Sequence, residues 1–547
     1  MHDRTAPFSR IVKSSPTRLE LRFACDEAAA TRLWELELLQ DFRQKAARTR
    51  RSRQLYFDTA QWHLRDSNVS LVIEQGNGRI TQRTKRKPSS ALKSDFSFEI
   101  ETVLASDAQP DRPVLTGFHA PTDALICAHE NALFPYLKME IVQRLSAGAY
   151  GEARISLIHE TSIIQGVNLE DSLEEQQLVL VHAGGDISDF HDFARALSSE
   201  AGLSLTGYTG QERALQKLKG NALPVVKAGK MVLPADASAL SVARLSFDQA
   251  VQQVTANGQA AAAGQPDAIK QLRVGLRRLR SLERLFRKSL QHPALNRLIP
   301  AAKEYGRILG VARDWDVFIE ATLPDILSAP TLEESDQAIL LALAHGAEGQ
   351  RAWAREKVRQ ALQSPAFTRL CIDLREQTDP VRWPVAGRRA LEIPAEAYAR
   401  QALGKRLRKV NLMGEDLASA PAHARHPLRV ELKKLRYAVQ AFRPLYEKER
   451  RKPYLSAMSD LQDAFGVLND AVVAREMALA AATPERRDQM VDVHRAMGAS
   501  FVIGWSAQQL QGQADIVYQA WSAFSQTPPF WEELEHASGE IAEEPVR

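Results

Sequence analysis

The most informative stretch of the chain covers residues 270–288 and reads KQLRVGLRRLRSLERLFRK. Every third or fourth position is basic, and at 100° per residue such positions share one face of an α-helix, here about 20 Å long. A neighbouring apolar face predicts the side that packs on a core. Glu283 is the only acidic residue in the stretch, so an external anion is the simplest counter-charge. The basic face consists of Lys270, Arg273, Arg277, Arg280, Arg284 and Arg287.

A second stretch, residues 425–443, reads RHPLRVELKKLRYAVQAFR and repeats the first at an offset of 156 residues, the difference between 273 and 429. At this offset five apolar residues are identical, and Arg280 aligns with Arg436. The same offset aligns LGVARDWDV, from residue 309, with FGVLNDAVV, from residue 465. A constant offset over several segments predicts a duplicated helical unit.

Four motifs in this order resemble the CHAD domain, the conserved histidine α-helical domain: QLRVGLRRLR, LGVARDWDV, HPLRVELKKLRY and LQDAFGVLND. The resemblance covers roughly residues 241–520. It implies an all-α fold of two pseudo-symmetric four-helix bundles with a basic channel between them. It also implies that inorganic polyphosphate is the ligand.

The resemblance further implies which residues bind polyphosphate. Lys270 stands where the family has its first-copy histidine, which keeps a positive charge but removes a titratable group. Any pH sensing would then rest on His426, which is either a phosphate ligand or a structural histidine. The implied polyphosphate-binding residues are Lys270, Arg273, Arg277 and Arg280 in the first copy and His426, Arg429, Lys433 and Arg436 in the second.

The same residues also have simpler interpretations. A basic helix face is usually just solvated, but the scarcity of acids and the repetition of the pattern favour a polyanion site. Asp314 and its counterpart Asp470 are expected to cap a helix or to hold the arginines in place, rather than to act as acid–base or metal groups. Gly310 and Gly466 are expected to mark the turn before that helix.

Composition limits the class of protein. The chain has 547 residues, which predicts more than one domain, and its net charge is only +4. The basic character is therefore local, which favours a defined anion site over diffuse coating of nucleic acid. Three dispersed cysteines indicate neither a disulfide framework nor a thiolate zinc site. The N-terminus lacks the apolar core of a signal peptide and no long apolar run occurs, so we expect a cytoplasmic protein that does not span a membrane.

The N-terminal part has the period-two pattern of β-strands. Residues 18–23, RLELRF, alternate charged and apolar side chains, and Asn77-Gly78 is a hairpin signal. Basic residues then alternate over residues 79–87, and residues 96–101 carry apolar residues on one face and acids on the other. Strands of this kind predict a barrel with a polar lumen.

The stretch YFDTAQWHLRDSNVSL, residues 56–71, resembles the CYTH domain, the triphosphate tunnel fold that includes inorganic triphosphatases and class IV-type adenylyl cyclases. The resemblance covers roughly residues 15–218, with departures at the chemical positions. The family's Glu-x-Glu-x-Lys is here Arg18, Glu20 and Arg22, its Arg-x-Arg falls on Val72 and Glu74, and its late Glu-x-Glu falls on Val179 and Val181. The residual tunnel candidates, catalytic or metal-binding, are Glu20, Lys85, Glu99 and Glu101, and Arg144 is also retained.

These departures predict a CYTH-like half that is catalytically inactive. Hydrolysis of a triphosphate in such a tunnel needs Mg²⁺ or Mn²⁺ held by several carboxylates. Glu20, Glu99 and Glu101 would be the metal ligands if activity remained, and Arg18 beside them would repel the ion. Polyphosphate binding itself requires no cofactor.

We therefore predict an α+β multidomain chain: an N-terminal antiparallel β-barrel with helices, followed by an all-α domain of two pseudo-symmetric four-helix bundles. Gly, Pro and Ala with little periodicity predict a linker over residues 219–238. The predicted parts are a disordered lead at 1–15, the barrel at 16–218, the linker, the helical domain at 239–525 with repeats at about 239–375 and 394–525, and an acidic tail at 526–547.

The leading hypothesis is a polyphosphate-binding protein that associates with intracellular polyphosphate granules, with granule proteins or with polyphosphate-metabolising enzymes. The first alternative is a metal-dependent inorganic triphosphatase whose helical half recruits substrate. The second is nucleic-acid binding, against which the basic face lacks interleaved aromatic residues for base stacking.

Overall fold

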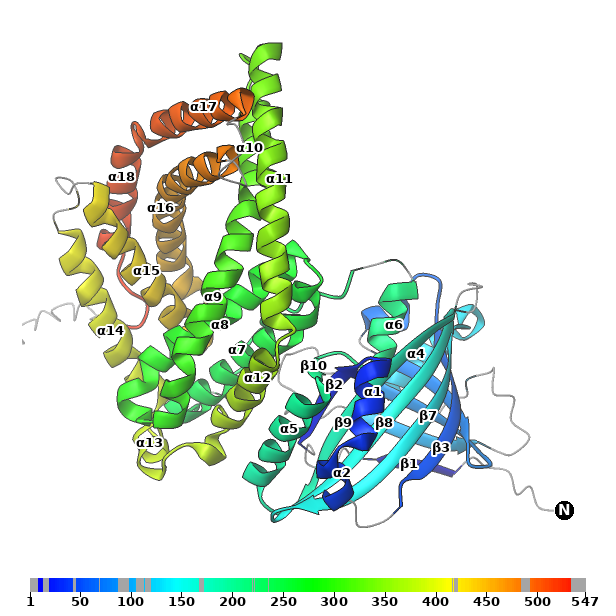
Figure 1. The fold of residues 1–547 in the computed structure, drawn as a ribbon. Coiled ribbons are helices and arrows are strands. Elements are labelled where there is room, and N and C mark those ends of the chain that lie inside the picture. The colour runs from blue at the N-terminus through cyan, green and yellow to red at the C-terminus, as the bar shows by residue number, and fades with distance from the viewer. Residues whose placement is uncertain are drawn as a thin grey trace, which may run out of the picture.

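The protein consists of a sheet part and a helical part that lie side by side (Figure 1). Its structure is a computed structural model. It describes residues 8–12, 19–42, 46–67, 69–86, 98–104, 113, 120–166, 172–218, 220, 222–234, 236–415, 417, 422–483 and 492–532. The predicted combination of an antiparallel sheet with helices and a C-terminal helical domain is confirmed. Arg18, predicted to repel a metal, lies outside the described residues.

The sheet part is one antiparallel sheet with the strand order β1-β6-β5-β4-β3-β7-β8-β9-β2-β10. Among the described strands, β1 and β10 are not paired with each other, so the sheet is not closed and the predicted term barrel applies only loosely. The strands are β1 (Phe8–Val12), β2 (Glu20–Cys25), β3 (Arg48–Asp58), β4 (Val69–Gly76), β5 (Arg79–Arg86), β6 (Phe98–Leu104), β7 (Phe134–Tyr150), β8 (Ala153–Gly166), β9 (Ser172–Gly184) and β10 (Ser204–Leu205).

Alternation along these strands divides the side chains between two faces, one mainly apolar and one that combines polar residues with a small apolar cluster around Met139 and Ile141. Helices α1 (Glu27–Glu35), α2 (Glu37–Phe42) and α5 (Ile187–Ala201) pack on the apolar face through residues such as Phe23, Phe42 and Phe193. α3 (His63–Asp66) and α4 (Ala120–Ala128) accompany β3–β5. The opposite face, called the polar face below, carries Arg50, Glu74, Arg83, Glu160 and Gln177.

The two parts share a core and a set of ion pairs. The apolar cluster beneath α5 continues into the helical part without interruption. On its edge, Arg195 of α5 donates to Asp373 at 2.7 Å and to Glu376 at 2.8 Å, both on α12 (Pro365–Gln377). Figure 1 shows α12 next to α5 at this junction.

The helical part repeats itself at the predicted offset. α7 (Ala239–Ala262), α8 (Pro266–Leu290), α9 (Pro293–Val317) and α11 (Glu334–Leu362) correspond to α14 (Ala395–Gly414), α15 (Ala422–Phe442), α16 (Lys448–Ala482) and α17 (Val493–Leu510). α7 and α14 begin 156 residues apart, at 239 and 395. The remaining helices are α6 (Gly210–Leu218), α10 (Leu323–Leu327), α13 (Val385–Ala390) and α18 (Gln513–Gln526).

Equivalent residues of the two copies contact each other, which places a pseudo-two-fold axis between them. The Ala239 N–H donates to the Ile393 carbonyl, and the Ala395 N–H donates to the Ala237 carbonyl, each at 2.9 Å. The rings of Phe286 and Phe442, which are also equivalent, meet edge to face at 6.1 Å between centroids.

Two predicted turns are absent. Gly310 lies inside α9, which runs unbroken to Val317, and Gly466 lies inside α16. Asp314 is therefore a mid-helix residue and not a helix cap, so the expected turn and the expected cap were wrong, whereas Asp314 does interact electrostatically with Arg273. Glycine in a helix interior costs only about 1 kcal/mol, which packing of long helices readily offsets.

Among the described residues, no helix is both long and apolar enough to cross a membrane.

Candidate anion-binding site

Four predicted ligands, Arg273, Arg277, Arg429 and Lys433, come together where α8 contacts α15, and Arg280 follows Arg277 along α8. We call Arg273, Arg277, Arg280, Arg429 and Lys433 the basic cluster. Arg273 and Arg277 both repel Lys433 across the interface, and Arg277 likewise acts on Arg429. The two basic helix faces therefore share one region.

The basic cluster is partly buried and lacks internal counter-ions. Within the described part of the chain, none of its five side chains makes an ion pair or a hydrogen bond. Burial lowers the pKa of Arg273, Arg280 and Arg429. Burial first, and then repulsion by Arg429, Arg277 and Arg273, lowers the pKa of Lys433 to about 7. Like charges placed this close together in a partly buried region destabilise the folded protein unless an anion binds and neutralises them.

Asp314 and Asp470 face the basic cluster without forming an ion pair with it among the described residues. Burial raises the pKa of Asp314, and the nearby Arg273 and Arg313 oppose that rise. Asp470 likewise moderates the depressed pKa of Lys433. Two carboxylates therefore offset part of the charge of five cations and leave an excess.

Gly310 leaves room for one of the cluster's arginines. A Cβ atom built on Gly310 of α9 would lie 3.6 Å from Nε of Arg273 and 3.8 Å from a terminal nitrogen. The guanidinium thus lies against α9 at the position where a larger side chain would project. At the equivalent Gly466, no atom lies within 4 Å of such a Cβ.

Other predicted residues lie apart from the cluster. Lys270 is exposed one turn before Arg273, and Arg436 donates to the side chain of Gln462. Arg287 forms an ion pair with the buried Glu283, so the basic face is neutralised at its C-terminal end. His426 belongs to α15, but its side chain lies outside the described residues.

Sequence reasoning missed Arg406 of α14. Burial lowers its pKa, Glu431 opposes this, and Arg284 adds to it, so it lies near the C-terminal half of the basic face of α8. Its equivalent in the first copy is Ala250, so the repeat gave no signal for it.

The residual tunnel candidates lie near opposite ends of the sheet order. Glu20 of β2 is paired with its neighbour Arg22, and its cross-strand partner is Val181. Glu99 and Glu101 of β6 lie opposite Lys85 and Arg83 of β5 in the register. The side chains of Lys85, Glu99 and Glu101 are outside the described residues. No group of three or more His, Cys, Asp or Glu that could hold a metal occurs among the residues described.

The polar face holds a carboxylate that its own arginines neutralise. The side chain of Glu74 is 4% exposed, binds Arg50 at 2.5 Å, pairs also with Arg83, and accepts a 2.9 Å hydrogen bond from Gln54. Arg144 was expected among the tunnel residues but lies on the other face. Its guanidinium there stacks 3.7 Å from the ring centroid of Trp34.

Comparison with known proteins agrees with the helical part. Residues 246–479 match the family model of the CHAD domain, so the chain contains a CHAD domain in its helical part. Among curated proteins, none matches the chain significantly.

Several solved structures are similar. The crystal structure of the CHAD domain from the plant Ricinus communis is 26% identical, with 56% of this chain and 98% of that chain covered and a TM-score of 0.48. PptA from Streptomyces chartreusis is 15% identical, with 52% and 100% covered and a TM-score of 0.42. A Hippeastrum protein, described as a candidate adenylyl cyclase with a dominant triphosphatase activity, is 15% identical, with 38% and 98% covered and a TM-score of 0.26.

Proposed function

We propose that this protein binds inorganic polyphosphate through the basic cluster. The observation that carries the proposal is a group of five partly buried cations on two equivalent helices, four of which meet across the interface, with none of the five paired with a carboxylate in the described part of the chain. Four of the five are arginines, whose planar guanidinium makes bidentate bonds to phosphate oxygens.

The chemistry of the ligand follows from the arrangement. A chain of phosphates offers negative charge at each unit and no apolar surface, which suits cations spread along two helices in contact. Arg273, Arg277 and Arg280 span about two turns of α8, or roughly 10 Å, enough to contact successive phosphates. Tyr437 lies beside Arg273, and an aromatic ring is a surface on which nucleic-acid bases stack. The test must therefore distinguish polyphosphate from nucleic acid.

We further propose that the sheet part is not a triphosphatase, and that the protein associates with polyphosphate granules or with enzymes acting on polyphosphate. Two facts support the first statement: Glu20 is neutralised by Arg22, and Glu74 by Arg50 and Arg83. A carboxylate held by arginine is poorly available to Mg²⁺ or Mn²⁺, which take oxygen ligands.

The first test replaces Arg273, Arg277 and Arg280 together by alanine. We expect at least about a 100-fold loss of affinity for long-chain polyphosphate, since hydrogen bonds to charged groups contribute about 1.5–3 kcal/mol each. The measurement is fluorescence anisotropy of labelled polyphosphate at fixed ionic strength, because salt alone changes such affinities.

The control variant removes the same charge elsewhere, by Arg297→Ala, Lys303→Ala and Arg389→Ala. These three side chains are exposed on α9 and α13. Its affinity should match that of the wild type. Equal loss in both variants, or tighter binding of single-stranded RNA or DNA than of polyphosphate at matched salt, would remove the proposal.

The second test concerns the sheet part. The full chain with Mn²⁺ or Mg²⁺ should release no phosphate from tripolyphosphate. The control is the double variant Glu99→Gln, Glu101→Gln, assayed in parallel for contaminating activity. Turnover by the wild type that this variant loses would show that the sheet part is an enzyme.

A further inference from the structure

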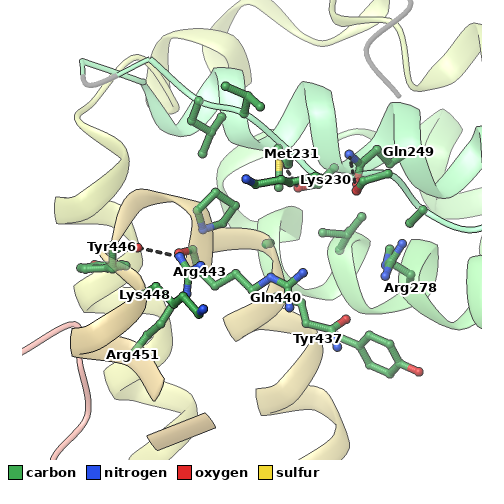
Figure 2. A pocket seen from close by; sticks show the side chains of 18 residues that line it. Lys230, Met231, Gln249, Arg278, Tyr437, Gln440, Arg443, Tyr446, Lys448 and Arg451 are labelled. Carbon is green, nitrogen blue, oxygen red and sulfur yellow. Dashed lines mark hydrogen bonds between the residues drawn. The ribbon is translucent and has the colours of Figure 1, made fainter. Parts of the chain in front are cut away.

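A cavity separate from the basic cluster lies beneath the segment that joins the two parts. Its volume is about 660 Å³, and its walls come from residues 228–233, α7, α8 and the region where α15 leads into α16. None of the five residues of the basic cluster lines it. Figure 2 shows Lys230 on the joining segment and Arg443 below it, both at this cavity, with Arg278 at one side.

The cavity is lined by cations without a carboxylate. Arg278 donates to the neutral Gln253 at 3.0 Å, and Arg451 donates to the Arg443 and Tyr446 carbonyls. The charged ends of Lys230 and Arg443 form no ion pair or hydrogen bond within the described residues. The cationic lining residues are Lys230, Arg278, Arg443, Lys448 and Arg451.

In the second copy, the residue equivalent to Arg278 is neutralised by a carboxylate of the chain. The counterpart of Arg278 is Lys434, which pairs with Glu431 at 2.5 Å, and Lys409 pairs with the same carboxylate at 2.9 Å. The first-copy counterpart of Glu431 is Gly275. A Cβ on Gly275 would lie 3.0 Å from a methyl group of Val254, so close packing excludes a carboxylate there. Arg278 is therefore left without its counter-ion.

The cavity also offers apolar and hydrogen-bonding groups. Met231, Leu282 and Tyr437 contribute to its lining beside the cations. Oε1 of Gln440, another lining residue, is buried and has no hydrogen-bond partner, so it can accept from a donor on a ligand. Inorganic phosphate chains carry neither an apolar part nor, when ionised, a donor for this oxygen.

The joining segment is held in place over the cavity. The Asn257 side chain accepts from the Val226 N–H at 3.0 Å and donates to the Val226 carbonyl at 2.8 Å. Gln249 donates to the Gly229 carbonyl at 3.3 Å. These bonds fix the backbone at two points shortly before Lys230, so the wall that carries this lysine is preformed.

We infer that this cavity binds a nucleoside di- or triphosphate. Its volume is in the range of small-molecule sites, about 300–1,000 Å³. Arg278, Arg443 and Lys230 would bind the phosphates. The base or sugar would lie against Met231 and Tyr437 and donate a hydrogen bond to Gln440. The inference does not depend on polyphosphate binding, because the two sites share no cation, although Tyr437 borders both.

The test is isothermal titration of the full chain with ATP, tripolyphosphate and adenosine. In the variant Arg273→Ala, Arg277→Ala, Arg280→Ala, where the basic cluster no longer competes for phosphates, ATP should bind more tightly than tripolyphosphate, and adenosine alone weakly. The variant Arg278→Ala, Arg443→Ala should weaken ATP binding at least about tenfold, and Lys230→Ala, at an exposed side chain, should weaken it several-fold with the fold intact. The matched control is Lys409→Ala, Lys434→Ala in the second copy, which should leave ATP affinity unchanged.

The variant Arg273→Ala, Arg277→Ala, Arg280→Ala separates the two sites and should retain ATP binding while it loses polyphosphate. The inference fails if, in this variant, ATP does not bind at millimolar concentration or if tripolyphosphate binds as tightly as ATP. It also fails if ATP binding follows the basic cluster and not Arg278, Arg443 and Lys230.

Discussion

The basic cluster and the polar face of the sheet both gather arginines, but they neutralise them differently. On the polar face, Arg50 and Arg83 share Glu74, and the buried Arg213 binds Glu175 at 3.1 Å. In the basic cluster no described cation has such a partner. An arginine paired with a carboxylate of the same chain needs no ligand to neutralise its charge. A cation without such a partner is neutralised by an anion from outside the chain. The difference favours a structural role for the sheet face and a binding role for the cluster.

The largest effect is expected where an internal counter-ion is removed. Glu74→Ala leaves Arg50 and Arg83 together on the polar face without their carboxylate. Breaking a buried pair costs about 3–5 kcal/mol. Because both arginines are partly exposed, we expect about 2–3 kcal/mol here, seen as faster amide hydrogen exchange in residues 69–86.

The matched control is Glu140→Ala, which breaks the pair with Lys138, where Glu140 is 55% exposed. Exposed pairs contribute about 0–1 kcal/mol, so exchange should hardly change. Polyphosphate affinity should stay constant in both variants. Unchanged exchange in Glu74→Ala would mean that the polar face does not depend on its ion pairs.

A smaller effect is expected from filling the space beside the cluster. Gly310→Leu places a side chain where the Arg273 guanidinium now lies, so we expect about a tenfold loss of polyphosphate affinity. Helix stability should rise, because leucine replaces glycine inside α9. The measurement pairs anisotropy with thermal unfolding.

Gly466→Leu is the control from the other copy, since no atom lies within 4 Å of a Cβ at that position. It should stabilise α16 without changing affinity. If both variants lost affinity equally, the effect would come from the helices and not from Arg273.

These glycines also show what the sequence could and could not predict. The repeat offset predicted two equivalent helices, α8 and α15, each with a basic and an apolar face, because the same apolar pattern recurs in both. That these helices contact each other and bring Arg277 near Lys433 was implied only by the resemblance to the CHAD domain. It could not predict that α9 and α16 run through Gly310 and Gly466, because local propensity is weaker than the packing of long helices.

The remaining misses share a cause: they depend on differences between the copies or on contacts distant in sequence. Arg406 faces α8 although its equivalent is alanine. Arg278 lacks a counter-ion because Gly275 replaces the acid of the second copy. The cavity below residues 228–233 and the open edges of the sheet arise from tertiary packing, for which the local sequence has no periodic signal.

The smallest expected effect is the pH dependence of polyphosphate binding, which reports directly on Lys433 and its lack of a counter-ion. The folded protein lowers the pKa of Lys433 to about 7, while the unfolded chain keeps it near about 10.4. Between these values the unfolded state binds more protons, so this group makes the protein more stable as pH rises from about 7 to 10. A bound polyanion restores the charged lysine and its pKa, so binding takes up a proton in that window.

Polyphosphate affinity should therefore fall about fivefold as pH rises from 7 to 8, by the same linkage. Titration calorimetry in two buffers of different ionisation enthalpy gives the protons taken up. Lys433→Arg keeps the charge at all these pH values, so it should bind with less proton uptake and a flatter pH profile. If wild type and variant took up protons equally, the crowding at Lys433 would not be relieved by the ligand, and the basic cluster would not be its binding site.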